Sequence, residues 1–332
     1  MLGFSWMGLI CDVMSVSSSV SDHHTTSSAE RFLLQSTNQS VTKPKKRTRG
    51  YYQAERALPY SQGREEASYT GTGMADHPTS ITTVIFDVGG VVVKSPLLGV
   101  NKFEKAEGLP ADYVNVAITA RGADGAFQKL EVGALQLPEF YAQFGDQMSD
   151  TPFNNAAYKR FCAKTERTCP SLPTTLQVDG KQLWKQMMVE ASTPNLPIIK
   201  LIKRLRESGK YRVAALTNNF QLPAGKTEDD QEALGLAPME IKNLFHEFIE
   251  SSQVGLRKPD PKFFEYALKL LNVRSPKEVV FFDDIGINLK AAEKLGINTI
   301  KVGINDVKPA LEQLQKYLPD LDLKDIINSA KL

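Results

Sequence analysis

Short runs of β-branched and aromatic residues recur along the chain from residue 82 onward, separated by longer stretches with helical periodicity. These runs lie at 82–86, 212–216, 247–251, 279–282 and 298–302. They are too short and too uniformly apolar to be surface helices, so we expect them to be buried parallel strands.

The stretches between these runs predict amphipathic helices. Residues 197–208 carry apolar side chains on one helical face and are followed by Gly209, a common helix stop. A second helix is expected to begin at Asp260-Pro261, with the aspartate as cap, and a third to cover 289–295. This alternation predicts a doubly wound parallel α/β sheet, whose ligands bind beyond the carboxyl ends of the strands.

The connection between the first two strands is far longer than a usual βα loop. It covers 94–193, about 100 residues, and must therefore form a domain of its own. Its apolar residues recur at helical spacing, which predicts an inserted helical cap with a core that includes Phe127, Leu130, Leu135, Phe140, Tyr141, Phe144, Trp184, Met187 and Met188. We expect a core domain formed by 81–93 and 194–332.

The chain before the first strand has a different composition. Of the 28 residues from 15 to 42, 13 are Ser or Thr, and no apolar period is sustained, so we expect a disordered tail over 1–80. A basic run at 43–49 would suit a nuclear signal, but a solvated tail is the favoured interpretation. Translation could also begin at Met74, in which case residues 1–73 would be an extension without enzymatic importance. Residues 221–238 are expected to form a mobile surface loop.

Charge, hydrophobicity and cysteine content limit which partners and which cellular location we expect. Lys plus Arg number 40 and Asp plus Glu 38, far from the basic excess that binding to nucleic acid usually needs. The apolar opening 1–11 is too short to span a bilayer, and the three cysteines form no C-x-x-C pair. We expect no nucleic-acid partner, no membrane span, a cytoplasmic location, and a monomer or homodimer.

Polar residues of a consistent kind follow four of the predicted strands. Asp87 follows the first strand, Thr217-Asn218 the second, Lys258 the third, and Asp283-Asp284 the fourth. Carboxylates suit Mg²⁺, while a hydroxyl, an amide and an ammonium could hold phosphoryl oxygens. Taken singly, each is explained by a turn or a helix cap. Together, in this order, they predict a phosphate-handling site at one edge of the sheet.

Four motifs, VIFDVGGVV, ALTNN, GLRKPDP and VVFFDDIGINLKAAEKLG, resemble in this order those of the haloacid dehalogenase superfamily. Within it, TNNFQLP and DDIGINLK make the chain similar to the N-terminal phosphatase domain of soluble epoxide hydrolase and to the similar domain of acyl-CoA dehydrogenase fusions. The resemblance covers about 82–302.

This resemblance implies a role for each matched residue. Asp87 would be the nucleophile that forms an aspartyl-phosphate, and Mg²⁺ would be held by Asp87, the carbonyl of Gly89 and Asp284, with Asp283 beside them. Thr217, Asn218 and Gly90 would bind the phosphoryl group of a small phosphorylated metabolite. Lys258 would neutralise the charge on Asp87 and the phosphate, and Asn288 would orient the acidic loop.

The chain departs from the family pattern at Gly89, where most family phosphatases have a second aspartate that protonates the leaving group. General acid–base groups contribute about 10² to 10⁴ in rate, so its loss could cost roughly 3 to 5 kcal/mol of barrier. Metal binding uses only the carbonyl at this position and need not suffer.

Residues 125–133 resemble a recurring cap pattern, G-x-W/F-x-x-L/F-E-x-G. Arg121, Gln128 and Glu131 are therefore candidate substrate contacts, although a solvated helix face is the favoured interpretation of each.

Three functions remain open. The leading one is a Mg²⁺-dependent phosphatase of a small organic or lipid-like phosphomonoester. The second is a metal-independent haloacid dehalogenase, against which the pair Asp283-Asp284 argues. The third is a catalytically weak module that senses a phosphorylated ligand or binds a partner, which Gly89 favours.

Overall fold

The computed structural model describes residues 80–221 and 239–330, and this part contains a five-stranded parallel sheet in the order β3-β2-β1-β4-β5. The strands are β1 (Thr83–Phe86), β2 (Arg212–Thr217), β3 (Glu247–Glu250), β4 (Val279–Asp283) and β5 (Asn298–Lys301). All five predicted strands are present, which confirms the doubly wound fold. The predictions for 1–79 and for 222–238 lie outside the described residues.

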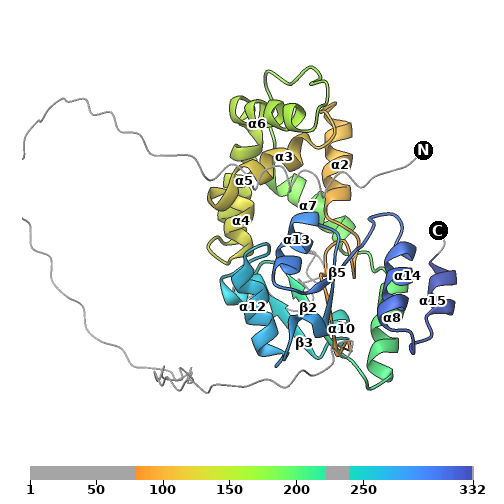
Figure 1. The fold of residues 1–332 in the computed structure, drawn as a ribbon. Coiled ribbons are helices and arrows are strands. Elements are labelled where there is room, and N and C mark those ends of the chain that lie inside the picture. The colour runs from red at the N-terminus through yellow and green to blue at the C-terminus, as the bar shows by residue number, and fades with distance from the viewer. Residues whose placement is uncertain (1–79, 222–238, 331–332) are drawn as a thin grey trace, which may run out of the picture. The chain divides into compact units, whose positions relative to one another are not determined.

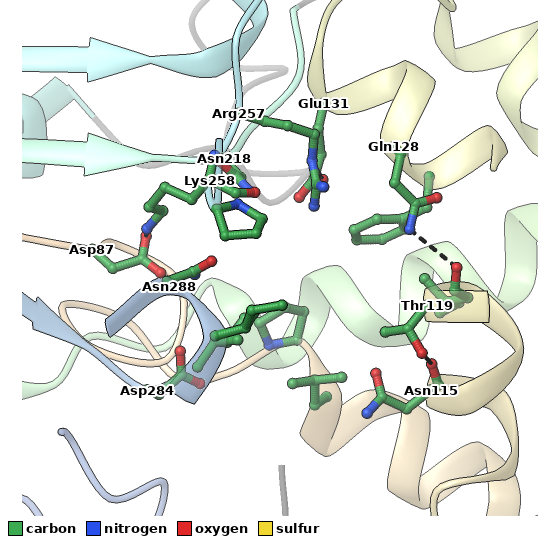
Figure 2. A pocket seen from close by; sticks show the side chains of 18 of the residues that line it. Asp87, Asn115, Thr119, Gln128, Glu131, Asn218, Arg257, Lys258, Asp284 and Asn288 are labelled. Carbon is green, nitrogen blue, oxygen red and sulfur yellow. Dashed lines mark hydrogen bonds and ion pairs between the residues drawn. The ribbon is translucent and has the colours of Figure 1, made fainter. Parts of the chain in front are cut away.

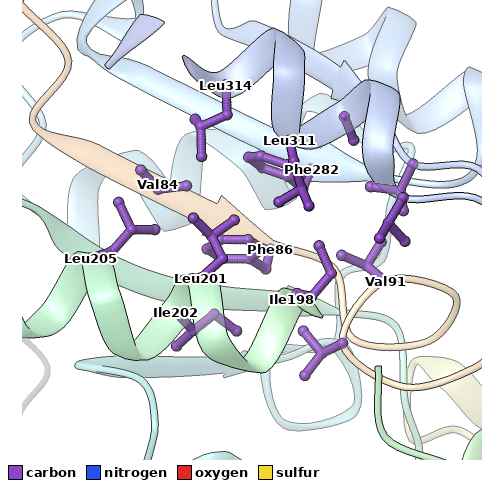
Figure 3. Close-up of a cluster of buried hydrophobic side chains, with 14 of the residues drawn as sticks. Val84, Phe86, Val91, Ile198, Leu201, Ile202, Leu205, Phe282, Leu311 and Leu314 are labelled. Atoms are coloured by element: carbon purple, nitrogen blue, oxygen red, sulfur yellow. The ribbon is translucent and has the colours of Figure 1, made fainter. Parts of the chain in front are cut away.

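Helices cover both faces of the sheet because successive strand residues alternate between two apolar clusters. Val84 and Phe86 lie in one cluster with residues of α8 (Leu196–Glu207) and α14 (Lys308–Tyr317) (Figure 3). The helix α15 (Lys324–Ser329) packs against α8 and α14 and adds Ile326 to this cluster. Ile85 packs on the opposite face with α12 (Pro261–Leu270) and α13 (Gly286–Lys294). Strands buried on both faces explain why their sequences are continuously apolar.

Shorter helices fill the remaining connections of the described sheet region, namely α10 (Met239–Lys242), α11 (Ser251–Val254) and the 3₁₀ turn η2 (Pro276–Glu278). The predicted cap of α12 is confirmed, since the Asp260 side chain accepts from the Lys262 N–H at 2.9 Å. The helix predicted over 289–295 begins earlier, at Gly286. The reason is local, because the Ile285 N–H is already turned onto the Asp283 carboxylate at 2.8 Å.

The register of the three central strands aligns their carboxyl ends. Phe86 pairs with Ala215 of β2 and with Phe282 of β4. The next backbone N–H, that of Asp87, donates to the Phe282 carbonyl at 2.8 Å. This register brings Asp87 beside Asp283. The chain leaves β1 toward β2 on one side and reaches β4 on the other, so this is the switch point where ligands of doubly wound sheets bind.

A set of helices that follows β1 in the chain lies apart from the sheet (Figure 1). These helices have an apolar core of their own. They are α2 (Leu97–Ala106), α3 (Tyr113–Ala120), the 3₁₀ turn η1 (Gly122–Asp124), α4 (Ala126–Glu131), α5 (Leu137–Ser149), α6 (Thr151–Lys164) and α7 (Gly180–Ala191). We call α2 to α7 the helical insert. Trp184, Met187 and Met188 lie in its core, as expected from the sequence.

The two chain segments that lead into and out of the helical insert lie side by side. The Lys94 N–H donates to Thr193 O at 2.8 Å, and the Asn195 N–H donates to Val92 O at 2.8 Å. The Asn195 side chain adds a bond to Val91 O at 2.9 Å. The insert is therefore joined to the sheet a few residues beyond Asp87. No helix in the described residues is long and apolar enough to cross a membrane.

Candidate active site

Three carboxylates meet at the carboxyl edge of the sheet. Asp87 follows β1, Asp283 ends β4, and Asp284 comes next in the chain. Each offers an oxygen within 4.8 Å of the others, and each side chain is buried. Buried ionised groups are stable only when they are paired or bind a cation, so this cluster needs compensation.

Lys258 provides one positive charge. Its Nζ lies 2.8 Å from Asp87 Oδ1 and 2.8 Å from Asp283 Oδ2, and the side chain is 1% exposed. Burial lowers the pKa of Lys258, but the attraction of Asp283 and Asp87 outweighs burial and raises it overall. Lys258 is therefore a charged bridge between Asp87, which follows β1, and Asp283, which ends β4. Figure 2 shows the Lys258 side chain reaching Asp87.

Asp283 and Asp284 have different surroundings. Both oxygens of Asp283 are engaged, by Lys258, by the Ile285 N–H and by Asn288 Nδ2 at 3.1 Å from each oxygen. Both oxygens of Asp284 are buried and have no partner among the described residues. Asp283 thus positions Lys258, whereas Asp284 has its oxygens free for a ligand.

Gly90 makes room for Asp284. Its backbone has φ +83°, and a Cβ at this position would lie 2.1 Å from Asp284 Oδ2. Any other residue would displace the carboxylate and strain the backbone.

Burial sets the protonation of the cluster when no cation is bound. It raises the pKa of Asp87 to about 7, although Lys258 lowers it and Asp283 raises it further. Burial and the charges of Asp283 and Asp87 raise the pKa of Asp284 well above its ordinary value. Buried carboxylate oxygens without protein partners are the ligand set of a hard divalent cation, so the residues present fit Mg²⁺.

Asp87 is held through one oxygen. Its Oδ1 accepts from the Val88 N–H at 2.7 Å and contacts Lys258. Neither of these two contacts involves Oδ2.

Thr217 and Asn218, which were expected to bind the phosphoryl group, have different positions in the structure. Asn218 lines the same cavity as Asp87, but its amide is committed to the backbone of Lys258, with Nδ2 donating to Lys258 O at 3.0 Å and Oδ1 accepting from Lys258 N at 2.9 Å. Thr217 is buried, has a long 3.5 Å contact to Asn218 O, and lines a smaller adjoining cavity of about 120 Å³. Asn218 therefore orients Lys258 in this structure.

A cavity of about 550 Å³ lies between this site and the helical insert. Its walls include Asp87, Lys258, Asp284 and Asn288 from the sheet side (Figure 2). The insert contributes mainly apolar groups, Leu97, Ile118, Ala123, Phe127, Val132 and Met187. Its neutral polar groups there are Asn115, Thr119 and Gln128.

One ion pair joins the helical insert to the sheet region at this cavity. Arg257 contacts Glu131 Oε2 through Nε and Nη2, both at 2.7 Å, and Ser251 Oγ donates to Glu131 O at 2.5 Å. Burial raises the pKa of Glu131, while Arg257 lowers it. The charge that Glu131 brings to the cavity is therefore balanced by Arg257.

Gln128 and Arg121, the other two candidate substrate contacts, differ in whether they line the cavity. Gln128 lines the cavity. The prediction that it lies on a solvated helix face is wrong, because its side chain is buried and donates to Ile118 O at 3.0 Å. Arg121 does not line the cavity. It contacts Gln147 O, Asp150 and Asn154 within the insert, which is a structural arrangement.

Two buried residues of the cavity, Ser95 and Asn115, were not predicted. Ser95 is 2% exposed and Asn115 7%, and Ser95 Oγ and Asn115 Nδ2 have no partner among the described residues. The one sequence signal was a polar residue inside the apolar stretch YVNVAITA, which gives no indication of a cavity.

Comparisons with known proteins place the chain in a family. The model of the haloacid dehalogenase-like hydrolases matches residues 81–296. The chain therefore belongs to this family of hydrolases.

Curated relatives agree with this assignment. The chain is 30% identical over 263 residues to acyl-CoA dehydrogenase family member 10 of Mus musculus, covering 79% of this chain and 21% of the relative. It is 29% identical over 239 residues to bifunctional epoxide hydrolase 2 of Rattus norvegicus, covering 71% and 39%. It thus spans well under half of either relative. A glyceraldehyde 3-phosphate phosphatase of Methanopyrus kandleri is 26% identical over 130 residues, covering 39% of this chain and 52% of the relative.

Proposed function

We propose that the protein is a Mg²⁺-dependent phosphatase that hydrolyses small organic or lipid-like phosphomonoesters through an aspartyl-phosphate. The observation that carries this proposal is the charge of the site, where three buried carboxylates meet the single ammonium of Lys258. A phosphomonoester is an anion, and it could approach these carboxylates only with a cation between them. The relative named as a phosphatase supports the same reaction class.

Asp87 is the nucleophile in this proposal. Lys258 and the Val88 N–H hold its Oδ1, which leaves Oδ2 to attack phosphorus. The ester oxygen departs, and water then cleaves the aspartyl-phosphate. Lys258 neutralises charge on both Asp87 and the phosphoryl group.

Asp87, Asp284 and the carbonyl of Gly89 would hold Mg²⁺, with Asp283 beside them. When bound, the cation would polarise the phosphoryl oxygens and offset their negative charge. The Thr217 hydroxyl and the Gly90 backbone would bind the phosphoryl oxygens. Asn218 would position Lys258, because its amide is hydrogen-bonded to the Lys258 backbone.

The helical insert would select the substrate. We propose that 94–193 is a cap domain over a core formed by 81–93 and 194–332, and that the alcohol part of the ester lies in the cavity between them. The walls from the insert are mainly apolar, and the charge of Glu131 is paired with Arg257. This lining favours an uncharged and partly apolar alcohol. A cytoplasmic location and a monomeric or homodimeric state are further parts of the proposal.

Two other functions make different predictions. A metal-independent dehalogenase needs only Asp87 and would leave the free oxygens of Asp284 without a role. A weak phosphate-binding module is favoured by Gly89, which supplies no acid to the leaving group.

One paired assay separates these candidates. Residues 1–332 are incubated with 4-nitrophenyl phosphate or with 2-chloropropionate, with Mg²⁺ and with EDTA. The proposal expects phosphate release that requires Mg²⁺ and no chloride release. Chloride release in EDTA would establish the dehalogenase, and tight phosphate binding without release of nitrophenol would establish the binding module.

A further inference from the structure

The site has no side chain at position 89 to stabilise the departing oxygen of the ester. An alkyl ester has a poor leaving group, so its cleavage depends on a hydrogen-bond donor or acid at that oxygen. Such a donor would have to lie on the cavity wall and have no other hydrogen-bond partner.

Most polar side chains of the cavity are already engaged. Thr119 donates to Asn115 O and Val116 O, Gln128 Nε2 donates to Ile118 O, and Asn218 is bound to Lys258. The unpartnered Oε1 of Gln128 is an acceptor directed at Gly125, where a Cβ would lie 1.9 Å from it. Among the described residues that line the cavity, Ser95 Oγ and Asn115 Nδ2 are the buried neutral donors left without a partner.

The contact between Pro96 and Gly89 places the neighbouring Ser95 at the end of the cavity near Asp87. Ser95 lies eight residues after Asp87, in the segment that enters the helical insert, whereas Asn115 lies on α3 within the insert. The Ser95-Pro96 segment covers the position of the missing side chain, since a Cβ on Gly89 would lie 3.7 Å from Pro96 Cδ. Gly89, Ser95 and Pro96 all line the cavity with Asp87.

We propose that Ser95 donates a hydrogen bond to the leaving oxygen of the substrate and partly replaces the aspartate that position 89 lacks. This inference rests on the proposed phosphatase function. The bond from Asp87 Oδ2 to phosphorus forms, the bond from phosphorus to the ester oxygen breaks, and its electron pair remains on that oxygen. The Ser95 hydroxyl stabilises the developing charge and keeps its own proton, and a water molecule protonates the alkoxide.

If Ser95 donates to the leaving oxygen, the effect of removing its hydroxyl on kcat should depend on the leaving group. 4-Nitrophenolate is a stable anion that needs little help to depart, whereas an alkoxide needs much. Ser95→Ala should therefore lower kcat for 2-phenylethyl phosphate by about 10- to 100-fold, and kcat for 4-nitrophenyl phosphate by no more than about threefold. The two esters are similar in size, so a defect in binding or folding would affect both.

Two further variants make the test specific. Ser95→Cys keeps the size of the side chain but has a weaker donor, and it should show the same selective loss. Gly89→Asp has room for its Cβ and supplies an acid, so adding it to Ser95→Ala should restore hydrolysis of 2-phenylethyl phosphate. Asn115→Ala empties another part of the same cavity and should not change the ratio of the two rates.

The outcomes separate this inference from the proposed function. A selective loss for the alkyl ester, with rescue by Gly89→Asp, supports the role of Ser95. Equal losses for both esters, or no loss, would overturn it while leaving the phosphatase intact. Wild-type protein that hydrolyses neither ester would overturn the proposed function and this inference together.

Discussion

Lys258 carries a large part of the charge balance of the site, because it contacts two buried carboxylates that belong to different strands. Asp87 and Asp283 each lie 2.8 Å from its Nζ. Asn218 fixes the backbone of Lys258, and Asn288 fixes Asp283. The Asp87 carboxylate is therefore held by a short network of buried residues rather than by one contact.

Replacing Lys258 by Met should test this network. The variant keeps the length of the side chain and removes its charge, so it leaves buried carboxylates unpaired and should lower the free energy of unfolding by about 3 to 5 kcal/mol. Urea denaturation monitored by circular dichroism would measure the loss. Lys308→Met is the matched control, since Lys308 pairs with Glu312 at 3.6 Å on the surface, and it should change stability by less than about 1 kcal/mol. Equal effects of the two variants would contradict the network.

Gly90 offers a second test, because a side chain at this position would both strain the backbone and displace the Asp284 carboxylate. Gly90→Ala should strain the left-handed backbone and push Asp284 aside, since its Cβ would lie 2.1 Å from Asp284 Oδ2. Gly108→Ala shares only the first cost, with φ +65° and nothing within 4 Å. Gly108→Ala should lose about 1 kcal/mol of stability and Gly90→Ala more than that, and only Gly90→Ala should reduce the rise in melting temperature expected on addition of Mg²⁺. The same Mg²⁺ response in both would argue against Asp284 as a ligand.

At the scale of elements, strand ends and helix starts determine which side chains reach the site. β1 and β4 place their carboxyl ends in register, and α13 begins directly after the acidic pair. Within the insert, α2 supplies a cap for α3. Glu104 on α2 accepts from Asp112 N at 3.0 Å and Val114 N at 2.8 Å, at the start of α3. This contact fixes the helix that carries Asn115.

Glu104 should make the stability of the protein depend on pH. Burial raises the pKa of Glu104 to about 7, although the two backbone N–H groups lower it. The folded state then binds more protons than the unfolded state between the ordinary pKa of 4.5 and about 7. Its contribution to stability is therefore greatest below that range and is lost as the pH rises through it.

The measurement compares unfolding in urea at pH 5 and pH 8 for wild type and Glu104→Gln. The stability of wild type relative to the variant should be higher at pH 5 than at pH 8. Glu107→Gln, at an exposed position on the same turn, should show no such change. A difference between wild type and Glu104→Gln that is independent of pH would show that Glu104 does not titrate in this range.

The sequence predicted most of these elements because each depended on local patterns. Buried strands are continuously apolar, and Asp260-Pro261 is a local helix start. Asp87, Lys258, Asp283 and Asp284 could be predicted because parallel strands bring their carboxyl ends to one edge. The start of α13 was placed too late, since the bond from Ile285 N to Asp283 is a local contact that periodicity does not reveal.

Other features depended on long-range contacts and could not be predicted. The amide of Asn218 binds the backbone of Lys258, 40 residues away, so its role as a clamp follows only from the fold. Ser95 and Asn115 are notable only because they are buried without partners in a cavity. A single sequence shows neither the cavity nor the missing partners.

At the scale of the whole molecule, the described residues form a sheet region and a helical insert that both line the cavity of about 550 Å³. The Glu131–Arg257 pair and the bond from Ser251 to Glu131 O join the two, and Trp184 of the insert packs edge-on against Phe220 with their rings 5.1 Å apart. The sheet provides the acidic cluster, and the insert provides most of the apolar wall. In the proposed function, the sheet region would perform the reaction and the insert would select the ester.

Hydrolysis of 4-nitrophenyl phosphate by wild type and by Asp87→Asn, each with Mg²⁺ and with EDTA, is the decisive test of Asp87 as the nucleophile. Asp87→Asn keeps the shape of the side chain but removes the nucleophilic carboxylate, and Asp146→Asn, at an exposed position of α5, is the control. We expect Mg²⁺-dependent turnover in wild type and in the control, and a loss of at least about 10³-fold in Asp87→Asn. Turnover by Asp87→Asn at the wild-type rate would contradict the assignment of Asp87 as the nucleophile.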